Sequence, residues 1–228
     1  MSTWFTADLH LSHTNIIVYS GRPFYDADSM NEAIIESWND MVAPDDTVWV
    51  LGDIAFGKQD QSLPLVGLLH GNKILVPGNH DRCFVGHRRL HKGDPEAHAI
   101  RLNRARQPYL DAGFAQIFDS PEPVDIAGHC VLLSHFPYVG DSRAEHDRYD
   151  AWRPINRGGW LVHGHVHEKW RQTGRQINVG LDAWGGRPVK IDEVANLINA
   201  GPGNLDRQIW EHNGVVRKPG APGHATTT

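Results

Sequence analysis

The chain has 228 residues, 40% of them hydrophobic, and a formal net charge of −5 with its histidines neutral. This length predicts one domain over residues 1–228, because single cores commonly reach roughly 200–250 residues before they split. The acidic balance argues against a dedicated nucleic-acid binder, so stable nucleic-acid binding is not expected. No apolar run approaches the roughly 18 residues of a membrane span, and two cysteines cannot build a disulfide framework. We therefore expect a cytoplasmic protein without a membrane partner.

Short apolar segments rich in β-branched or aromatic residues predict buried strands. They cover residues 4–7, 47–51, 73–76, 131–133, 160–162 and 176–179. Residues 28–42 between the first two have the spacing of an amphipathic helix, with Asp28 or Ser29 as its N-cap. A less regular pattern predicts a second helix over 59–70. Alternating strands and helices indicate parallel pairing, which gathers the segments that follow the strands at one edge of a sheet.

Two segments differ in composition from the rest of the chain. Residues 82–112 read as an insertion, with seven Lys or Arg residues between positions 82 and 106 and a helix that begins at Asp94-Pro95. This insertion is either a solvated surface segment or a basic flap near a substrate. Residues from about 203 to 228, which include many glycines and prolines near their ends, predict a flexible tail.

Polar motifs follow five of the predicted strands, and the first two are individually weak signals. In Asp8-Leu9-His10, alternate positions of an extended segment would project to the same side, where both side chains could reach one cation. Gly52-Asp53 is ordinary turn chemistry, and its value lies in its position. If the flanking strands are neighbours, the Asp53 carboxylate could bridge two metal ions with its two oxygens.

The third motif, Gly78-Asn79-His80-Asp81, places an amide, an imidazole and a carboxylate in consecutive positions. The amide oxygen of Asn79 is a neutral metal ligand, and His80 is left for proton transfer. Asp81 is expected to hydrogen-bond the His80 imidazole and raise its basicity. The competing interpretation is a simple turn with a bystander histidine.

Histidines follow the last two predicted strands that end in a polar motif. His135 follows Ser134, and Gly164-His165-Val166-His167 would aim two imidazoles the same way if the segment is extended. Imidazole is the commonest nitrogen ligand for divalent metals of intermediate softness. We expect His163, which precedes this motif, to point away from the site and to be structural.

A loop over residues 140–159 lies between these histidine motifs and should therefore lie close to the site. Its candidate substrate-binding residues are Arg143, His146, Arg148 and Arg153. A purely structural loop is the alternative. Trp152, Trp170 and Trp184 could serve a homo-oligomer interface or a nucleobase platform, but core packing is the commoner fate of tryptophan.

In this order the five motifs resemble the signature of the calcineurin-like metallophosphoesterases, over residues 5 to about 184. The run from 161 to 168 and Ile177-Asn178-Val179-Gly180-Leu181-Asp182 further resemble the small phage and bacterial members. The resemblance implies an α/β fold, a four-layer α/β/β/α sandwich of βαβ units with ligands at the carboxyl ends of the strands.

The resemblance also implies two metal ions. One ion would be held by Asp8, His10, Asp53 and His167, and the other by Asp53, Asn79, His135 and His165. His80 would be the catalytic histidine that protonates the leaving oxygen, with Asp81 as its carboxylate partner, and His13 lies outside the signature. Mixed nitrogen and oxygen ligands suit Mn, Fe, Zn or Ni better than Mg or Ca. Among these the resemblance implies Mn²⁺, with Fe, Zn and Ni as alternatives.

The function expected from this set is hydrolysis of small phosphodiesters by in-line attack of metal-bound hydroxide, with 2′,3′- or 3′,5′-cyclic nucleotides as candidate substrates. A phosphomonoesterase, including a protein phosphatase or a dinucleotide polyphosphate hydrolase, would use the same ligands. A nuclease stays open because of the basic segment, as does a non-catalytic binding module on the same fold. Physiological substrate, native metal pair and oligomeric state are left open.

Overall fold

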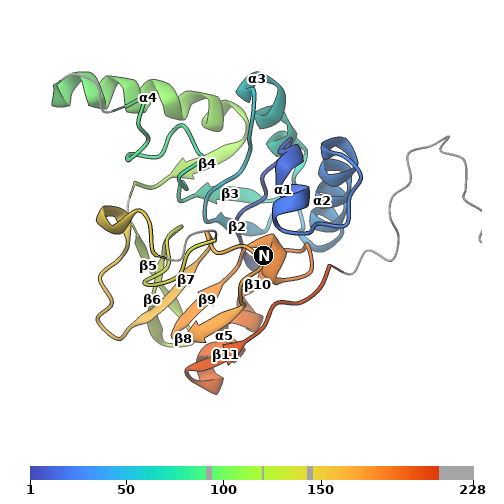
Figure 1. Cartoon of the computed structure of the whole chain (residues 1–228), viewed down its shortest axis with the longest axis vertical. Coiled ribbons are helices and arrows are strands. Elements are labelled where there is room, and N and C mark those ends of the chain that lie inside the picture. Colours follow the sequence, from blue (N-terminus) through green and yellow to red (C-terminus); the bar gives the residue numbers. More distant parts are fainter. Residues whose placement is uncertain (91–93, 120, 143–145, 211–228) are drawn as a thin grey trace, which may run out of the picture.

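The described residues of the computed structural model, 1–90, 94–119, 121–142 and 146–210, form two sheets (Figure 1). The first sheet runs in the order β10 (Val189–Lys190), β1 (Thr3–Thr6), β2 (Thr47–Val50), β3 (Asn72–Leu75) and β4 (Phe114–Ile117). The second runs in the order β11 (Gly203–Leu205), β8 (Gln172–Gly174), β9 (Gln176–Asn178), β7 (Trp160–His163), β6 (His129–Leu133) and β5 (Glu122–Ile126). All six strands predicted from the sequence are confirmed, with ends shifted by one or two residues.

Parallel pairing brings the ends of the central strands together. Strands β1 to β4 pair in parallel in chain order, with Phe5 opposite Trp49 and Trp49 opposite Ile74. In the second sheet β7 is parallel to both β6 and β9. The loops that follow β1, β2 and β3 therefore leave the same edge of the first sheet, as the sequence predicted.

Helices supply the crossovers. The helical segments are α1 (Thr14–Tyr19), α2 (Ala27–Met41), α3 (Gln59–Ser62), η1 (Leu63–Leu68), α4 (Pro95–Asp111), η2 (Asp150–Trp152), η3 (Leu181–Ala183) and α5 (Ile191–Ala200). The predicted amphipathic helix is α2, but its N-cap is Asp26, whose carboxylate accepts a hydrogen bond from Ser29 N. The predicted caps Asp28 and Ser29 are wrong because both already lie inside the helix. The second predicted helix is divided between α3 and the 3₁₀ segment η1.

The basic segment 82–112 connects β3 to β4 and contains α4. Asp94 caps this helix by accepting a hydrogen bond from Ala97 N at 2.8 Å, and Pro95 is its first residue, as predicted. Leu102 and Tyr109 are buried on one side of α4. Because β4 extends the first sheet, the segment is a crossover of that sheet as well as a basic surface.

Two apolar clusters hold the layers together. The first joins α1, α2 and η1 to the first sheet and includes Ile34, Trp38 and Val48. The second contains residues from both sheets and from α5, among them Phe5 and Val162. The chain is thus a mixed α/β fold built on two multi-stranded sheets, while the complete four-layer order remains a prediction.

The tail predicted from about residue 203 is wrong for residues 203–210. Here β11 pairs antiparallel with β8, and Trp210 packs edge-on against Phe24 with ring centroids 5.2 Å apart. The guanidinium of Arg22 lies 5.4 Å from the Trp210 ring centroid. Residues 211–228 of the predicted tail lie outside the described residues.

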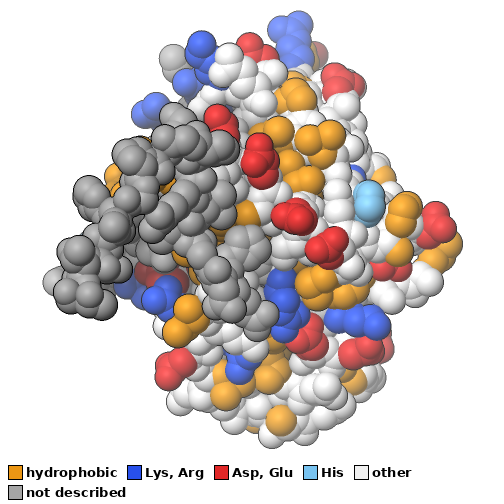
Figure 2. All heavy atoms as spheres, turned by 90° about the vertical axis from the view of Figure 1, so that its right-hand side faces the viewer, with side chains coloured by type: hydrophobic (Ala, Val, Ile, Leu, Met, Phe, Trp, Pro, Cys, Tyr) orange, Lys and Arg blue, Asp and Glu red, His pale blue; other side chains and the backbone are white. Residues whose placement is uncertain are grey.

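The surface seen from the right-hand side of Figure 1 carries Lys and Arg interspersed with Asp and Glu (Figure 2). Of the two cysteines, Cys83 is buried and Cys130 is exposed. Among the described residues, no helix combines the length and the apolar character that crossing a membrane requires.

Candidate metal centre

The five sequence motifs meet at the carboxyl-terminal ends of strands from both sheets. They follow β1, β2 and β3 in the first sheet and β6 and β7 in the second. Asp8 N donates to Gly52 O at 2.9 Å and His10 N donates to Asp53 O at 3.0 Å, so the loops after β1 and β2 run side by side. The loop after β7 is tied to the loop after β6 by a hydrogen bond from Gly164 N to His135 O at 3.1 Å. Backbone hydrogen bonds therefore position the site before any ligand binds.

Left-handed backbone conformation at the candidate ligands determines the direction in which their side chains point. Five predicted metal ligands have positive φ angles: Asp8 (58°), His10 (51°), Asp53 (55°), His165 (73°) and His167 (50°). The prediction that Asp-x-His and His-x-His lie on extended segments is therefore wrong, although each pair does reach the same site. Ordinary L-residues avoid this conformation, and such outliers concentrate at functional sites.

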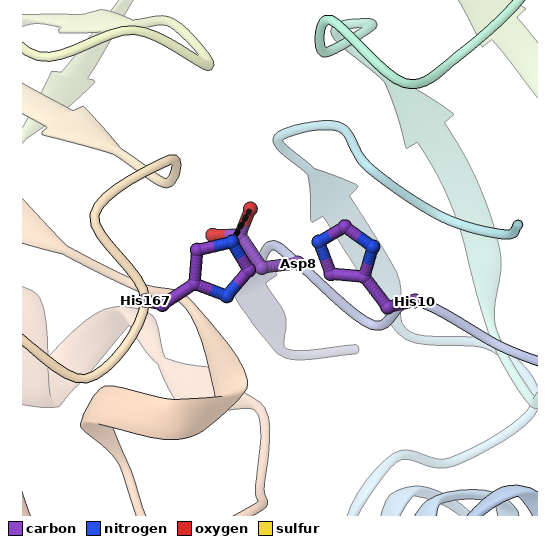
Figure 3. Close-up of side chains that lie close together, drawn as sticks. All are labelled: Asp8, His10 and His167. Atoms are coloured by element: carbon purple, nitrogen blue, oxygen red, sulfur yellow. Dashed lines mark ion pairs between the residues drawn. The ribbon is translucent and has the colours of Figure 1, made fainter. Parts of the chain in front are cut away.

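Asp8, His10 and His167 form one ligand group (Figure 3). His167 Nε2 lies 4.0 Å from Asp8 Oδ1, and the His10 and His167 rings stack with centroids 5.0 Å apart. Asp8 Oδ1 and His10 Nε2 are buried without a hydrogen-bond partner. Buried polar atoms normally have partners, so these atoms fit a cation bound between them.

Asp53 joins this group to a second one. Its Oδ2 lies 3.8 Å from His10 Nε2 and 3.5 Å from His135 Nε2. His135 Nε2 in turn lies 3.2 Å from Asn79 Oδ1 and 3.3 Å from His165 Nδ1. The donor atoms of both predicted ion sites therefore converge, with one carboxylate oxygen between them.

The two oxygens of Asp53 have different surroundings. Asp53 Oδ1 accepts a hydrogen bond from His80 N at 2.8 Å. Oδ2 is the oxygen that lies near imidazoles of both ligand groups, and the bridge through both oxygens stays a prediction. Asp8 is used in the same way, because its Oδ2 accepts from His165 N at 2.9 Å and its Oδ1 is left for a cation.

Each imidazole contributed by the second sheet is oriented by a hydrogen bond from its far nitrogen. His135 Nδ1 lies 2.8 Å from Leu51 O, and His165 Nε2 lies 3.1 Å from Asp141 Oδ2. Both partners are acceptors, so the imidazole nitrogens donate to them and leave His135 Nε2 and His165 Nδ1 as lone pairs toward the centre. This is the usual way a protein fixes the tautomer of a metal-binding histidine.

His167 is oriented by a buried ion pair. Its Nδ1 lies 3.1 Å from Asp182 Oδ2, and Arg22 donates to both oxygens of Asp182 at 2.8 and 3.0 Å. Arg22 also donates to Leu9 O and Asp8 O, so the same guanidinium braces the Asp-x-His loop. Asp182 lies in a ligand-like group with His167 and Glu168, but its bidentate contact with Arg22 marks it as an orienting carboxylate.

Asp81 does not take the role that the sequence predicted. Its carboxylate accepts three backbone hydrogen bonds, from Gly78 N, Asp53 N and Ile54 N, and it is fully buried. Burial, followed by the negative charge of Asp53, raises the pKa of Asp81 to about 7. Asp81 therefore clamps the loops after β2 and β3 together, and the expected hydrogen bond to the His80 imidazole is replaced by these backbone contacts.

His80 lies at the mouth of the site with 41% of its side chain exposed. Its Nε2 is 4.0 Å from Asp53 Oδ2, and its ring meets the His10 ring edge-on at 5.4 Å. It is therefore close to the shared carboxylate oxygen, yet open to a bound molecule. Its role as the catalytic histidine that is not a ligand stays a prediction.

Burial dominates the electrostatics of the ligands. It raises the pKa of Asp8 to about 6 and lowers the pKa of His10, His135 and His165. Although burial opposes it, Asp8 and Asp182 raise the pKa of His167. Neutral imidazoles are the form that binds a metal, so the lowered pKa values of the three histidines favour ligation.

Small residues allow the loops to approach this closely. A Cβ added to Gly164 would lie 2.5 Å from Ala7 Cβ and 2.7 Å from Asp8 Oδ2. A Cβ at Gly78 would lie 2.7 Å from His135 Nδ1. The glycines that precede the ligands in these motifs therefore follow from the close packing of loop against ligand.

No protein-family model matches the chain. It is 37% identical over 212 residues to the Gene 66 protein of Mycobacterium phage L5, covering 87% of this chain and 94% of the relative. The Gene 66 protein of Mycobacterium phage D29 is 38% identical over 206 residues, with 87% and 96% covered. The chain belongs to the family of these Gene 66 proteins.

A solved structure supports the fold of this Gene 66 family member. The protein of unknown function AQ665 from Aquifex aeolicus is 26% identical, with a TM-score of 0.60 over 86% of this chain and 98% of that one. A match over this share of the chain includes residues of both sheets.

Of the four predicted substrate-binding residues of the Gene 66 family member, Arg148 lies at the site. It lines a cavity of about 250 Å³ together with His10, Asp53 and His80, while its Nη2 is 2.6 Å from Asp141 Oδ1. Arg153 is buried and donates to the carbonyl oxygens of residues 137, 140 and 148, so its prediction is corrected to a structural role in the loop. His146 is exposed, and Arg143 lies outside the described residues.

Two further histidines of the Gene 66 family member contact the ligand loops, and His13 also lines the cavity over the candidate site. His13 Nδ1 lies 3.3 Å from His10 Nδ1, and its ring stacks on Phe56 with centroids 3.9 Å apart. His163 is fully buried, with its Nδ1 2.7 Å from Gly164 O, which agrees with the structural role predicted for it. Sequence reasoning missed Arg22 and Asp141 as supporting residues, since neither belongs to a polar motif at a strand end.

Proposed function

We propose that this Gene 66 family member is a metal-dependent phosphoesterase that hydrolyses small phosphodiesters. The observation that carries the proposal is Asp53 Oδ2, which lies within 4.0 Å of imidazole nitrogens of His10, His135 and His80. One carboxylate oxygen thus stands between two ligand groups and next to an exposed histidine. The resemblance of the motif order to the calcineurin-like metallophosphoesterases supports the same conclusion.

The residues present fit two divalent ions. Asp8, His10, Asp53 and His167 would hold one ion, and Asp53, Asn79, His135 and His165 would hold the other. When bound, two such ions polarise phosphoryl oxygens and lower the pKa of an attacking water toward neutrality. Mn²⁺ is the proposed metal, because a mixed imidazole, carboxylate and amide set suits it better than it suits Mg²⁺ or Ca²⁺.

The side chains around the proposed metal centre supply the proton donor and the substrate-binding cavity. His80, exposed at the mouth, donates a proton to the departing oxygen, while its backbone N–H holds Asp53 Oδ1 in place. The cavity of about 250 Å³ over the centre matches a small ester, and it is lined by Phe56 and Tyr149 on the side of His80. Among small esters, 2′,3′- and 3′,5′-cyclic nucleotides are the proposed substrates.

Metal analysis and hydrolysis of two chromogenic esters test this function. The protein prepared with Mn²⁺ should retain about two ions per chain and hydrolyse bis(p-nitrophenyl) phosphate faster than p-nitrophenyl phosphate, and a chelator should abolish both activities. His80→Ala should lower kcat by about 10²–10⁴-fold, because it removes a proton donor.

His129→Ala, at an exposed histidine at the start of β6, is the matched control and should leave kcat unchanged. Activity that survives chelation would overturn the proposal, as would a protein that retains no metal. Faster turnover of the monoester would favour the phosphomonoesterase alternative, which the same ligands serve.

A further inference from the structure

A second cavity opens next to the metal centre, on the far side of His80. Its volume is about 460 Å³, within the range of small-molecule sites. It shares four lining residues with the cavity over the metal centre: Phe56, Asn79, His80 and Tyr149. A molecule bound at the centre could therefore extend past His80 into this second cavity, which we call the basic pocket.

The charged side chains that line the basic pocket are all positive. They are Arg82, Arg88 and Arg89, and none of the described lining residues is Asp or Glu. Partial burial of His87, followed by the charges of Arg89 and Arg82, lowers the pKa of that lining histidine. The three arginines therefore line one cavity. A guanidinium is the side-chain group best suited to a planar, bidentate contact with phosphate.

Aromatic rings also line the basic pocket. Phe56 is 38% exposed, and its ring meets the His80 ring edge-on at 5.3 Å. Phe84, which is buried, and Tyr149, which is partly buried, line the pocket as well. An exposed ring such as that of Phe56 can stack on a flat ring, and stacking tolerates different bases.

We infer that the basic pocket receives the leaving group of the substrate and that this leaving group carries a second phosphate. The inference rests on the proposed function, in which His80 protonates the departing oxygen. Because His80 lines both cavities, the alcohol that departs on its side enters the basic pocket. In a cyclic nucleotide the leaving oxygen stays attached to the product, so the basic pocket extends the proposed substrates to a second class, linear phosphodiesters whose leaving alcohol is a phosphorylated nucleoside.

The reaction balances with water as the only co-reactant. The oxygen of one water forms a bond to phosphorus, and the bond between phosphorus and the leaving oxygen breaks with its electron pair on that oxygen. His80 gives the leaving oxygen a proton and is reprotonated by the proton that the water loses. The products are a phosphomonoester and an alcohol that keeps its own phosphate.

Binding to the metal-free protein tests the pocket without relying on turnover. Calorimetric titration with uridine 5′-monophosphate and with uridine, in the presence of EDTA, should show about tenfold tighter binding of the nucleotide, as expected for one or two charge-assisted hydrogen bonds. The double variant Arg88→Ala/Arg89→Ala should lose most of this preference.

The matched control is Arg104→Ala/Arg207→Ala, which removes the same charge from exposed positions outside the pocket lining. It should keep the preference within about twofold, because distant exposed charges are screened by salt. Equal losses in both double variants would mean that net charge alone attracts the nucleotide, and would overturn the inference.

Hydrolysis of dinucleotides tests the position of the leaving group. With Mn²⁺, either pUpU or UpUp should be cleaved with a kcat/KM about tenfold above that of UpU, and Arg88→Ala/Arg89→Ala should bring this ratio close to one. Equal cleavage of all three dinucleotides would overturn the inference. Turnover of bis(p-nitrophenyl) phosphate under the same conditions tests the proposed phosphodiesterase function separately from the basic pocket, since this ester carries no second phosphate.

Discussion

The two sheets contribute to the proposed metal centre in different ways. The loops of the first sheet carry the candidate oxygen ligands Asp8, Asp53 and Asn79 and one imidazole, His10, and backbone N–H groups hold one oxygen of each carboxylate. The loops of the second sheet contribute imidazoles, and each of these is held by a hydrogen bond from its far nitrogen. An oxygen ligand can thus be placed by the main chain, whereas an imidazole needs a second acceptor to fix its tautomer.

This difference also separates the carboxylates that support the centre. Asp81 acts on the backbone of the first sheet's loops, where it gathers three N–H groups. Asp141 and Asp182 act on the imidazoles of the second sheet's loops. Substitution of one residue of each kind should therefore give different phenotypes.

Among substitutions of the supporting residues, the largest effect is expected from Asp182→Asn. The change weakens the hydrogen bond to His167 Nδ1 and removes the charge that pairs with Arg22. We expect Mn²⁺ affinity and kcat/KM to fall by about 10–100-fold, as for other residues that orient metal ligands. Metal titration followed by atomic emission, and kinetics with bis(p-nitrophenyl) phosphate, measure the two quantities.

Asp192→Asn is the control for that substitution, because Asp192 is an exposed carboxylate on α5, far from the ligand loops in sequence. It should leave metal affinity unchanged. Unchanged Mn²⁺ affinity in Asp182→Asn would contradict the role assigned to the far nitrogen of His167.

Asp81→Asn should mainly reduce stability. Asparagine offers one acceptor oxygen, so the N–H of Ile54 would face an amide N–H₂ group. Leaving a buried donor unsatisfied costs about 1–3 kcal/mol, which urea denaturation of the metal-free protein would measure. If Asp81 instead tuned His80, the substitution would shift the pH dependence of kcat and leave the urea midpoint in place.

The smallest effect is expected from His163→Leu, in the second sheet but outside the ligand set. Gly164 O keeps its hydrogen bond from Val166 N, so the backbone loses only one of two donors. The free energy of unfolding should change by about 1 kcal/mol or less. Loss of bound Mn²⁺ in this variant would show that the second sheet contributes a fourth imidazole.

The sequence predicted the central strands and the positions of the motifs because both depend on local patterns. Buried parallel strands such as β2 and β7 are continuous apolar runs, and the ligands follow them directly. Short strands at sheet edges lack this signal. The two residues of β10 and the Gly203–Leu205 segment of β11 are strands because of their neighbours, and the sequence alone suggested a tail for the latter.

The direction in which each ligand side chain points, and the residue that holds it by a hydrogen bond, could not be predicted, because both depend on contacts between segments that are distant in sequence. Nothing in Asp8-Leu9-His10 indicates left-handed backbone, which depends on hydrogen bonds to the loop after β2. The contact between Arg22 and Asp182 joins residues 160 positions apart. Asp81 was misjudged because its neighbour His80 is adjacent in sequence, whereas its three actual donors are brought together by folding.

The left-handed ligands have a consequence for stability. Each non-glycine residue in this conformation costs roughly 1–2 kcal/mol of backbone energy that glycine would not incur. Five such positions surround the candidate site, so glycine at any of them would relieve backbone strain while it removed a side chain whose buried hydrogen bonds hold the loops together. The stability of such a variant is the difference between these two contributions. Retaining the five side chains therefore acts against their own backbone preference.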